Sequence, residues 1–181
     1  SPEMLSVARE KLYNNGNSPL LLCQSAAELD LYGTVDGAIC CLDSINHITD
    51  EKELLESFKR ISLFLEKGRL FIFDVNTEYK HKEILSGNTF KAEADDIVCI
   101  WNNSLCDENG VVEITLEFYN KTTAENDFIC SEQFSERAYS DKALTKMLKK
   151  AGLEVLARLG ENGENEPQKT EQRIIYVTRK I

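Results

Sequence analysis

The sequence of 181 residues has few of the residue types from which metal and disulfide sites are usually built. It contains two histidines, His47 and His81, and its six cysteines form no C-x-x-C pair. Clusters of such ligands at short spacings are what a zinc site requires, so we expect no metal site. Most of the cysteines stand inside apolar runs. We interpret them as buried thiols of a protein in a reducing cytoplasm, without disulfides.

Long apolar runs and an excess of positive charge are also missing. No apolar stretch approaches the roughly 18 residues of a membrane span, and the first residues show no signal-peptide pattern. The net charge is −10, which disfavours nucleic acids and anionic membranes as partners because both are polyanions. The remaining composition, 42% hydrophobic and 29% charged, is that of one ordinary globular domain.

The most informative stretch runs from Val35 to Asn76 and has the pattern strand, loop, helix, strand. Residues 35–42 and 69–76 are near-continuous apolar runs, which is typical of parallel strands covered on both faces. Asp50 is positioned to cap the helix between them, and Lys67-Gly68 is expected to end it. The helix carries one apolar stripe: Leu54, Leu55, Phe58, Ile61 and Leu65.

Small polar clusters follow both of these strands, Asp43-Ser44 after the first and Asp74-Val75-Asn76 at the end of the second. A right-handed crossover connects parallel strands, so the two carboxyl ends should meet at one edge of the sheet. Ligands of open α/β sheets bind at that edge. The sequence therefore predicts a binding site there.

The residues before this unit predict less regular structure. Ser1 can cap an amphipathic helix that Asn14-Asn15-Gly16-Asn17 would end, and Leu20–Gln24 is expected to be a short buried strand. Between residues 25 and 34 we expect at most a turn or two of helix. A helix that starts at the first residue, with nothing before it to pack on, indicates that upstream sequence is missing.

The residues after Asn76 predict a helix over 78–85 and then an antiparallel meander inserted into the α/β body. Its three strands are expected at Ile97–Leu105, Val111–Tyr119 and Phe128–Arg137, the last two joined by the polar run 121–127. Apolar and polar residues alternate in the second strand, so one face should be solvated. A helix capped by Ser140 and ended by Gly152 follows, and the chain closes with strands over 153–159 and 173–178.

In this order, the motifs resemble a class I S-adenosylmethionine-dependent methyltransferase of the small bacterial type with a β-meander insertion. The resemblance covers essentially the whole chain. It rests on SPEML at residues 1–5, LCQ at 22–24, DGAICCLDSIN at 36–46, LEKGRLFIFD at 65–74, ERAYS at 136–140 and LKKAGL at 148–153.

The resemblance implies an α/β fold with a Rossmann-like methyltransferase sheet. That sheet is mostly parallel, with an antiparallel C-terminal strand and helices on both faces. Residues 1–181 would form a single domain, the C-terminal three quarters or so of the family's domain, with residues 88–138 as a β-meander insertion on the substrate side.

Two departures from the family pattern bear on the cofactor, S-adenosyl-L-methionine. The family's glycine-rich loop and the acidic residue that ends its second strand have no counterpart here. We therefore expect an N-terminally truncated fragment that is impaired in cofactor binding. Secondly, Ser25 stands where the family usually has an Asp that accepts from the adenine amino group, and a hydroxyl is a weaker and less selective acceptor.

The resemblance also implies site residues. The expected cofactor-binding residues are Ser25, Ala26, Leu42 and Asp43, and the expected substrate-side residues are Asn76, Tyr79, Trp101, Arg137 and Tyr139. Structural alternatives stay open: Asn46 and His47 could line the cleft or cap the helix, Trp101 could be core, and Arg137 could pair with Glu136 or Asp141. No catalytic residue is named, because methyl transfer depends mainly on alignment and exclusion of water.

The expected function is cytoplasmic methyl transfer to an unidentified small-molecule acceptor, by in-line displacement. The alternative is a non-catalytic binding or oligomerisation module on the same fold, and a homo-oligomer stays open. A nicotinamide-dependent fold is a third reading, but no glycine-rich loop follows any visible strand to support it.

Overall fold

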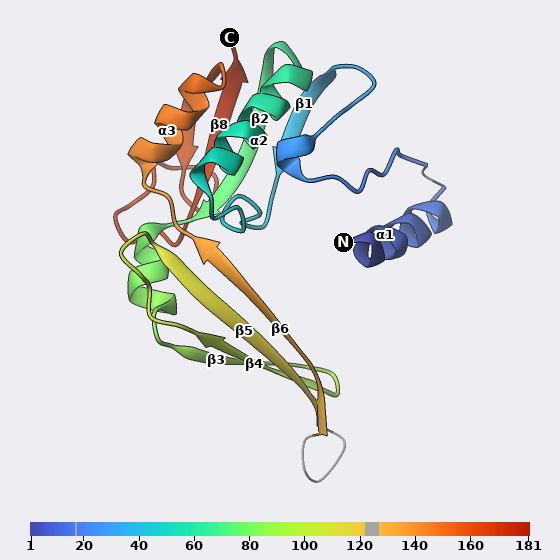
Figure 1. The fold of residues 1–181 in the computed structure, drawn as a ribbon, viewed down its shortest axis with the longest axis vertical. Helices are drawn as coiled ribbons and strands as arrows, with labels where there is room; N and C mark the ends of the chain where they lie inside the picture. The colour runs from blue at the N-terminus through green and yellow to red at the C-terminus, as the bar shows by residue number, and fades with distance from the viewer. Residues whose placement is uncertain (17, 122–126) are drawn as a thin grey trace.

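The computed structural model describes residues 1–16, 18–121 and 127–181, and these form two four-stranded sheets (Figure 1). The first sheet has the order β1 (Val35–Cys40), β2 (Leu65–Asn76), β8 (Arg173–Lys180), β7 (Leu153–Leu159). β1 and β2 pair in parallel, and β8 runs antiparallel to β2 and to β7. Three strands therefore share one direction and the C-terminal strand opposes them, which confirms the predicted Rossmann-like sheet.

One face of this sheet is covered by α2 (Glu51–Phe64) and α3 (Asp141–Lys150), which also contact each other. Phe58 of α2 packs edge-on against Phe71 of β2, with ring centroids 6.3 Å apart. Phe73 of β2 stacks on Tyr176 of β8 at 5.0 Å. Burying each of these side chains stabilises the fold by about 1.5–3 kcal/mol. These rings form the centre of the main core.

The ends of α2 show one confirmed and one wrong prediction. Asp50 caps the helix as predicted, since its Oδ1 accepts from the backbone N–H groups of Lys52 and Glu53, each at 2.9 Å. The helix ends at Phe64, however, and not at Lys67-Gly68. Leu65 is already extended, is fully buried and pairs with Val35, so strand pairing ends the helix before the glycine is reached.

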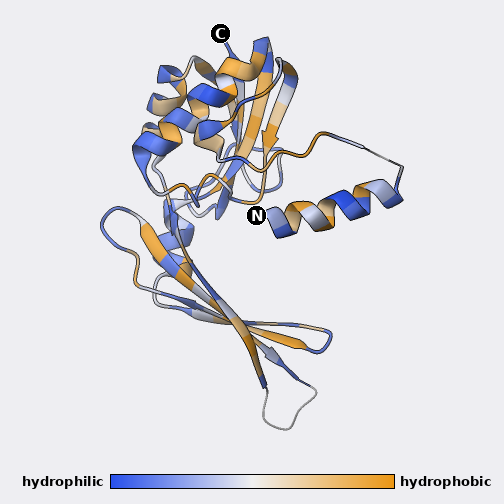
Figure 2. Ribbon diagram, turned by 45° about the vertical axis from the view of Figure 1, so that its right-hand side comes forward, coloured by the Kyte–Doolittle hydropathy of each residue, from blue (hydrophilic) through white to orange (hydrophobic). Residues whose placement is uncertain are grey.

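The other face of the first sheet is open in the part of the chain that the structure describes. Side chains alternate between the faces of a strand, so Ile39 and Leu70 point away from the helices. They are 76% and 39% exposed. The prediction of helices on both faces is therefore not met in these residues, because the remaining long helix, α1 (Pro2–Asn14), buries none of its residues and lies apart (Figures 1 and 2).

The N-terminal segment differs from the prediction after its first helix. α1 is capped as expected, with Ser1 Oγ accepting from the N–H of Met4 at 3.3 Å. Of the predicted helix end, Asn17 lies outside the described residues. Leu20–Gln24 is not a strand, because none of the strands that the structure describes pairs with it, and Leu20 is exposed. The short 3₁₀ helix η1 (Ala26–Glu28) follows and packs against α2.

The predicted meander is present and has one strand more than expected. A π-helical segment, η2 (Lys80–Leu85), leads into the second sheet. Its order is β3 (Thr89–Ala94), β4 (Ile97–Asn103), β5 (Val111–Asn120), β6 (Asp127–Arg137), all antiparallel. β3 was missed although Phe90, Ala92 and Ala94 alternate with Lys91 and Glu93, because the segment is short, two of its three apolar residues are alanines and all six of its residues are exposed. Of the predicted polar connection 121–127, residues 122–126 lie outside the described residues.

The expected burial of the cysteines is wrong. None of the six falls among the buried residues, and Cys23, Cys41 and Cys130 are exposed. The first lies in the unpaired N-terminal segment and the second directly after β1, which is an edge strand. Partial burial does raise the pKa of Cys40, Cys99 and Cys106. Among the helices described, none has the length and apolar character to cross a membrane.

Candidate functional site

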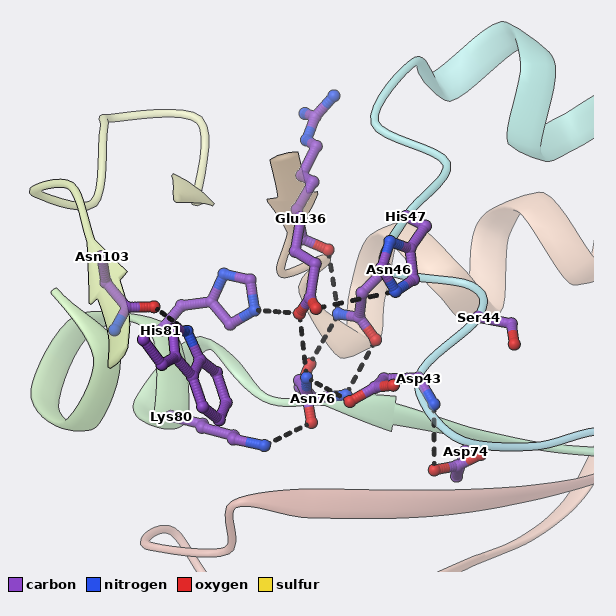
Figure 3. A network of polar contacts seen from close by, with 12 residues as sticks. Asp43, Ser44, Asn46, His47, Asp74, Asn76, Lys80, His81, Asn103 and Glu136 are labelled. Carbon is purple, nitrogen blue, oxygen red and sulfur yellow. Dashed lines mark hydrogen bonds and ion pairs between the residues drawn. The ribbon is translucent and has the colours of Figure 1, made fainter. Parts of the chain in front are cut away.

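Polar side chains from several elements meet at the carboxyl ends of β1 and β2, and Figure 3 shows most of them. We call this group the strand-end network. Its members are Asp43, Asn46 and His47 after β1, Asp74 and Asn76 of β2, Lys80 and His81 of η2, Glu136 of β6 and Arg173 of β8. The backbone N–H of Asp43 donates to Asp74 Oδ2 at 3.3 Å. The predicted meeting of the two strand ends is therefore confirmed.

Asn76 is the centre of the network. Its Nδ2 donates to Asp43 Oδ2 at 2.8 Å and to Glu136 Oε2 at 3.0 Å. Its Oδ1 accepts from Lys80 Nζ at 2.9 Å. The residue is 2% exposed, so this one buried amide joins the ends of β1, β2 and β6 to the start of η2.

Asn46 holds the loop after β1 in place by hydrogen bonds to the end of β2 and to the end of β6, where the meander returns to the first sheet. Its Nδ2 donates to the carbonyls of Asn76 and Arg137, at 3.1 and 2.9 Å, and its Oδ1 accepts from the N–H of Asn76 at 2.9 Å. The residue is fully buried. Helix capping is performed by Asp50, so the role of Asn46 is to fix the loop and not to start α2.

Arg173 supplies positive charge to the carboxylates at the strand ends. It forms ion pairs with Asp74 and, at 3.1 Å, with Asp43. Asp74 Oδ1 is buried without a hydrogen-bond partner in the described residues, and an unpaired buried oxygen costs about 1–3 kcal/mol. Such a group is one that a ligand donor could satisfy.

Glu136 is a buried carboxylate between two histidines. It is 5% exposed, and its carboxylate oxygens lie 3.7 Å from His47 Nε2 and 3.6 Å from His81 Nε2. Burial opposes its ionisation, but the imidazole of His81, the amide of Asn76 and the positive potential of the two rings outweigh burial. Together they hold the pKa of Glu136 below its usual value. The carboxylate is therefore charged at neutral pH.

The four predicted cofactor residues lie in two places. Leu42 and Asp43 follow β1 with φ angles of +59° and +50°, a conformation that costs a non-glycine residue about 1–2 kcal/mol. Such strain is concentrated at functional sites. Ser25 and Ala26 are exposed at η1, where Ser25 Oγ accepts from the N–H of Ala27 at 3.3 Å. No hydrogen bond joins the two pairs within the described residues.

These residue types fit S-adenosylmethionine. Leu42 offers an apolar side chain that is 76% exposed, suited to a flat nucleobase or an alkyl chain. Asp43 and Ser25 offer oxygen acceptors for ribose hydroxyls and amino groups. For a metal, by contrast, no group of three or more His, Cys, Asp or Glu side chains in the described residues is arranged to hold an ion.

Two of the five predicted substrate-side residues, Asn76 and Arg137, serve as structural joints. Arg137 donates to the carbonyls of Asn109 and Thr49, at 3.1 and 3.0 Å, and pairs with Glu51 at 2.8 Å. Its predicted partners, Glu136 and Asp141, are therefore not the ones observed. Contact with a substrate is a separate matter and stays a prediction for both residues.

The three predicted aromatic residues have different surroundings. Tyr139 donates to the carbonyl of Ile48 at 2.5 Å, and burial raises its pKa to about 12. Tyr79 and Tyr139 both line a cavity of about 190 Å³ beside Tyr176. Trp101 donates to Asn103 Oδ1 at 2.8 Å and packs against the meander's own small core, as its structural alternative allowed.

Sequence reasoning did not identify Glu136, His81, Lys80 or Arg173 as site residues. They stand on three elements distant in sequence, and only strand pairing brings them together. The one usable signal was that His81 is one of two histidines and lies in a predicted helix directly after a strand end. Glu136 stands in a mixed polar stretch that looks like a solvated strand.

Comparison with known proteins indicates the kind of protein to which this site belongs. No family model matches the chain. A crystal structure of an S-adenosylmethionine-dependent methyltransferase from Clostridium acetobutylicum is 32% identical, with a TM-score of 0.90, over 99% of this chain and 72% of that chain. The curated Bacillus subtilis protein named "Putative methyltransferase YqeM" is 27% identical over 183 residues, which are 99% of this chain and 72% of that protein.

The cofactor is seen in a more distant neighbour. CalS10 from Micromonospora echinaspora, solved with bound S-adenosylmethionine, has a TM-score of 0.73 at 16% identity, over 99% of this chain and 71% of that chain, and so shares the fold. These relatives favour an enzyme over a non-catalytic module. They confirm S-adenosylmethionine as the cofactor and a methyl acceptor as the substrate. On its sequence and its structure, the chain belongs to the class I S-adenosylmethionine-dependent methyltransferases.

Proposed function

We propose that the protein methylates a small-molecule acceptor at the carboxyl ends of β1 and β2 by in-line displacement. The observation that carries the proposal is the strand-end network, in which buried amides and ion pairs fix both strand ends and the root of the meander. When bound, the cofactor supplies a methyl group already activated on a sulfonium. Holding the reacting groups in line and excluding water is then the main task of the protein.

For the cofactor we propose Leu42 and Asp43 at the end of β1, with Ser25 and Ala26 at η1. The strained backbone of the first pair supports this, because it turns the chain sharply where ligands of such sheets bind. Asp43 is also held by Asn76 and Arg173, so its carboxylate is preoriented.

For the acceptor we propose the side of the cleft formed by the meander, residues 88–138 of a single domain 1–181. The meander enters through η2, directly after the end of β2, and insertions after strand ends build the mouths of such clefts. The substrate-side residues proposed are Asn76, Tyr79, Trp101, Arg137 and Tyr139. A small molecule is supported by the net charge of −10, which repels nucleic acids. CalS10, which shares the fold, is named an amino pentose methyltransferase.

We further propose that residues 1–181 alone bind the cofactor weakly and self-associate. In the described residues β1 pairs with β2 on one side only, and Leu20–Gln24 does not pair with its other edge. A free edge presents unpaired backbone donors and acceptors, and a second chain can pair with them. The residues of the proposed cofactor site next to that edge are then not held in place by a neighbouring strand.

Calorimetric titration tests the proposed function most directly. We expect heat of binding with S-adenosylmethionine and with its demethylated product, and none with NAD. Trp101→Ala should lower acceptor turnover and leave cofactor affinity nearly unchanged. Trp101 is preferred to Arg137 for this test because Arg137 also holds the fold together. Binding of NAD alone, or loss of cofactor affinity in a folded Trp101→Ala variant, would contradict the proposal.

A further inference from the structure

The two histidines of the sequence face the same buried carboxylate from opposite sides. His47 Nε2 lies 3.7 Å from Glu136 Oε1, and His81 Nε2 lies 3.6 Å from Glu136 Oε2 (Figure 3). The side chain of His81 is fully buried, whereas that of His47 is 45% exposed. One imidazole is therefore sealed inside the protein, and the other reaches the solvent side of the strand-end network.

The inner imidazole fixes the position of a proton. His81 Nδ1 lies 3.0 Å from the carbonyl oxygen of Gly110, which can only accept, so Nδ1 carries hydrogen. A neutral His81 would then aim the lone pair of Nε2 at an ionised Glu136, which is repulsive. A proton on His81 Nε2, facing the ionised carboxylate of Glu136, removes this repulsion.

The charge balance of the strand-end network leads to the same conclusion. Three carboxylates, those of Asp43, Asp74 and Glu136, face two permanent cations, Lys80 and Arg173. Buried charges of one sign are costly unless they are paired. One additional proton on the histidine–glutamate pair makes the network neutral.

The imidazole of His47 is held so that its Nδ1 nitrogen is free to accept a proton. The ring of His47 packs against Phe134 of β6, with centroids 5.0 Å apart. Because Nε2 faces the carboxylate of Glu136, the favoured tautomer carries its hydrogen on Nε2. The other nitrogen, Nδ1, is then an acceptor on an exposed side chain. A carboxylate that fixes the tautomer of a general base is the arrangement of a serine hydrolase triad.

We propose that His47 is the general base that removes a proton from the methyl acceptor, and that Glu136, supported by His81, is the positioning residue for it. This inference rests on the proposed function and narrows its substrate class. The acceptor is a nucleophile that arrives carrying a removable proton, as an ammonium or a hydroxyl group, and not one that is already deprotonated.

The proposed step balances in atoms and electrons. His47 Nδ1 takes the proton from the acceptor nitrogen or oxygen. The electron pair left on that atom forms the bond to the methyl carbon. The bond from this carbon to sulfur breaks, and sulfur keeps the electron pair and loses its positive charge. Glu136 stabilises the imidazolium produced, and the proton then leaves to solvent through the exposed side of His47.

The pH dependence follows from the groups that face this pair. The titratable or charged residues around the pair are Glu136 on β6 and His81 and Lys80 on η2. Asp43 and Asp74 lie at the strand ends, and both pair with Arg173 of β8. A general base must be unprotonated to accept a proton, so His47 acts only as the neutral imidazole. Turnover should therefore rise with pH through the range in which histidine loses its proton.

The deciding experiment is nitrogen NMR on protein labelled at histidine, which needs no acceptor. With two histidines in the chain, His81→Gln assigns the signals. We expect His47 to be the Nε2–H tautomer and Glu136→Gln to convert it to a mixture of tautomers. A predominant Nδ1–H tautomer in the wild type, or no change in Glu136→Gln, would overturn the proposal.

A kinetic test uses ethanolamine, which carries an amine and a hydroxyl, as the acceptor with radiolabelled S-adenosylmethionine. His47→Ala should lower turnover about 100-fold or more, and added imidazole should restore part of it. The exposed control Lys52→Ala should stay within twofold of the wild type. Unchanged turnover in His47→Ala would refute the base. Complete absence of cofactor binding by the wild type, as distinct from the weak binding proposed above, would instead refute the proposed function and leave the tautomer result to decide this inference.

Discussion

The first two long helices of the chain have similar sequence signals and different structural outcomes. α1 and α2 each begin with a side-chain cap, have acidic residues in the first turn and carry an apolar stripe. Leu54 and Phe58 of α2 are completely buried, whereas Met4 of α1 is 74% exposed and α1 buries no residue. The difference lies in the sheet that α2 packs on, not in either helix.

This comparison shows which part of a helix prediction is local. Caps and periodicity determine whether a segment becomes a helix, and both helices begin where predicted. Stability comes mostly from packing an apolar face against another element, and periodicity does not identify that element. The predictions that follow use the contrast between the segment 1–34 and the unit 35–76.

The largest difference is expected for apolar truncations on the two helices. Phe58→Ala should lower the free energy of unfolding by about 3–5 kcal/mol, because it opens a cavity beneath Phe71 and Phe73. Met4→Ala on α1 should change it by no more than about 0.5 kcal/mol. Urea denaturation followed by circular dichroism measures both. Equal losses would mean that α1 packs against the core in solution.

The proposed cofactor site combines residues from both regions, so its affinity tests how well they are held together. We expect residues 1–181 to bind S-adenosylmethionine at least a hundredfold more weakly than the Clostridium acetobutylicum relative, which is roughly 2.7 kcal/mol. Calorimetry gives the affinities and sedimentation the expected self-association. A monodisperse monomer that binds as tightly as the relative would contradict this expectation.

Removing the N-terminal caps of α1 and α2 tests the same contrast between the two helices, with a smaller expected effect on stability. Asp50→Ala should cost about 1 kcal/mol of global stability, because it leaves the N–H groups of Lys52 and Glu53 without their acceptor. Ser1→Ala removes an equivalent cap and should leave the global unfolding transition in place. The measurement is again the unfolding free energy. A matching shift for Ser1→Ala would show that α1 unfolds together with the core.

The smallest expected effect is in the pH dependence of stability. The pKa of Glu136 is lowered in the fold, so its ionised form contributes stability above the pKa of the unfolded chain, about 4.3. That contribution is lost as the pH falls through the lower folded pKa. Glu136→Gln should therefore flatten the decline of stability in acid. Glu3→Gln, on the undocked α1, should leave that decline unchanged, and an equal flattening would contradict the contrast.

Much of the fold could be predicted because its signals are local. The apolar runs of β1 and β2, the stripe of α2 and the cap of α3 each lie within one segment, and the meander was predicted from its alternating strands. Leu20–Gln24 was predicted wrongly by the same criterion, since an apolar run becomes a strand only if a neighbour pairs with it. β3 was missed because it lies on the surface and pairs only at the edge of its sheet.

The site was predictable only in part. Asp43 and Asn76 end strands that are one crossover apart, and a topological rule brings them together. Glu136 is brought to them by the register of β5 and β6, in which it pairs with Val112. That register depends on contacts across the whole meander, and no short window of sequence contains it.

The contacts of Arg137 have a mechanical consequence for the meander. This side chain ties the root of the second sheet to Thr49 and Glu51 at the start of α2, while the far end of the sheet extends away from the body (Figure 1). Arg137 is therefore the point at which the second sheet is attached to the first part of α2. Phe134, three residues along the same strand, packs on His47. A tilt of the sheet about this attachment would move Phe134 and so change the packing of the His47 ring.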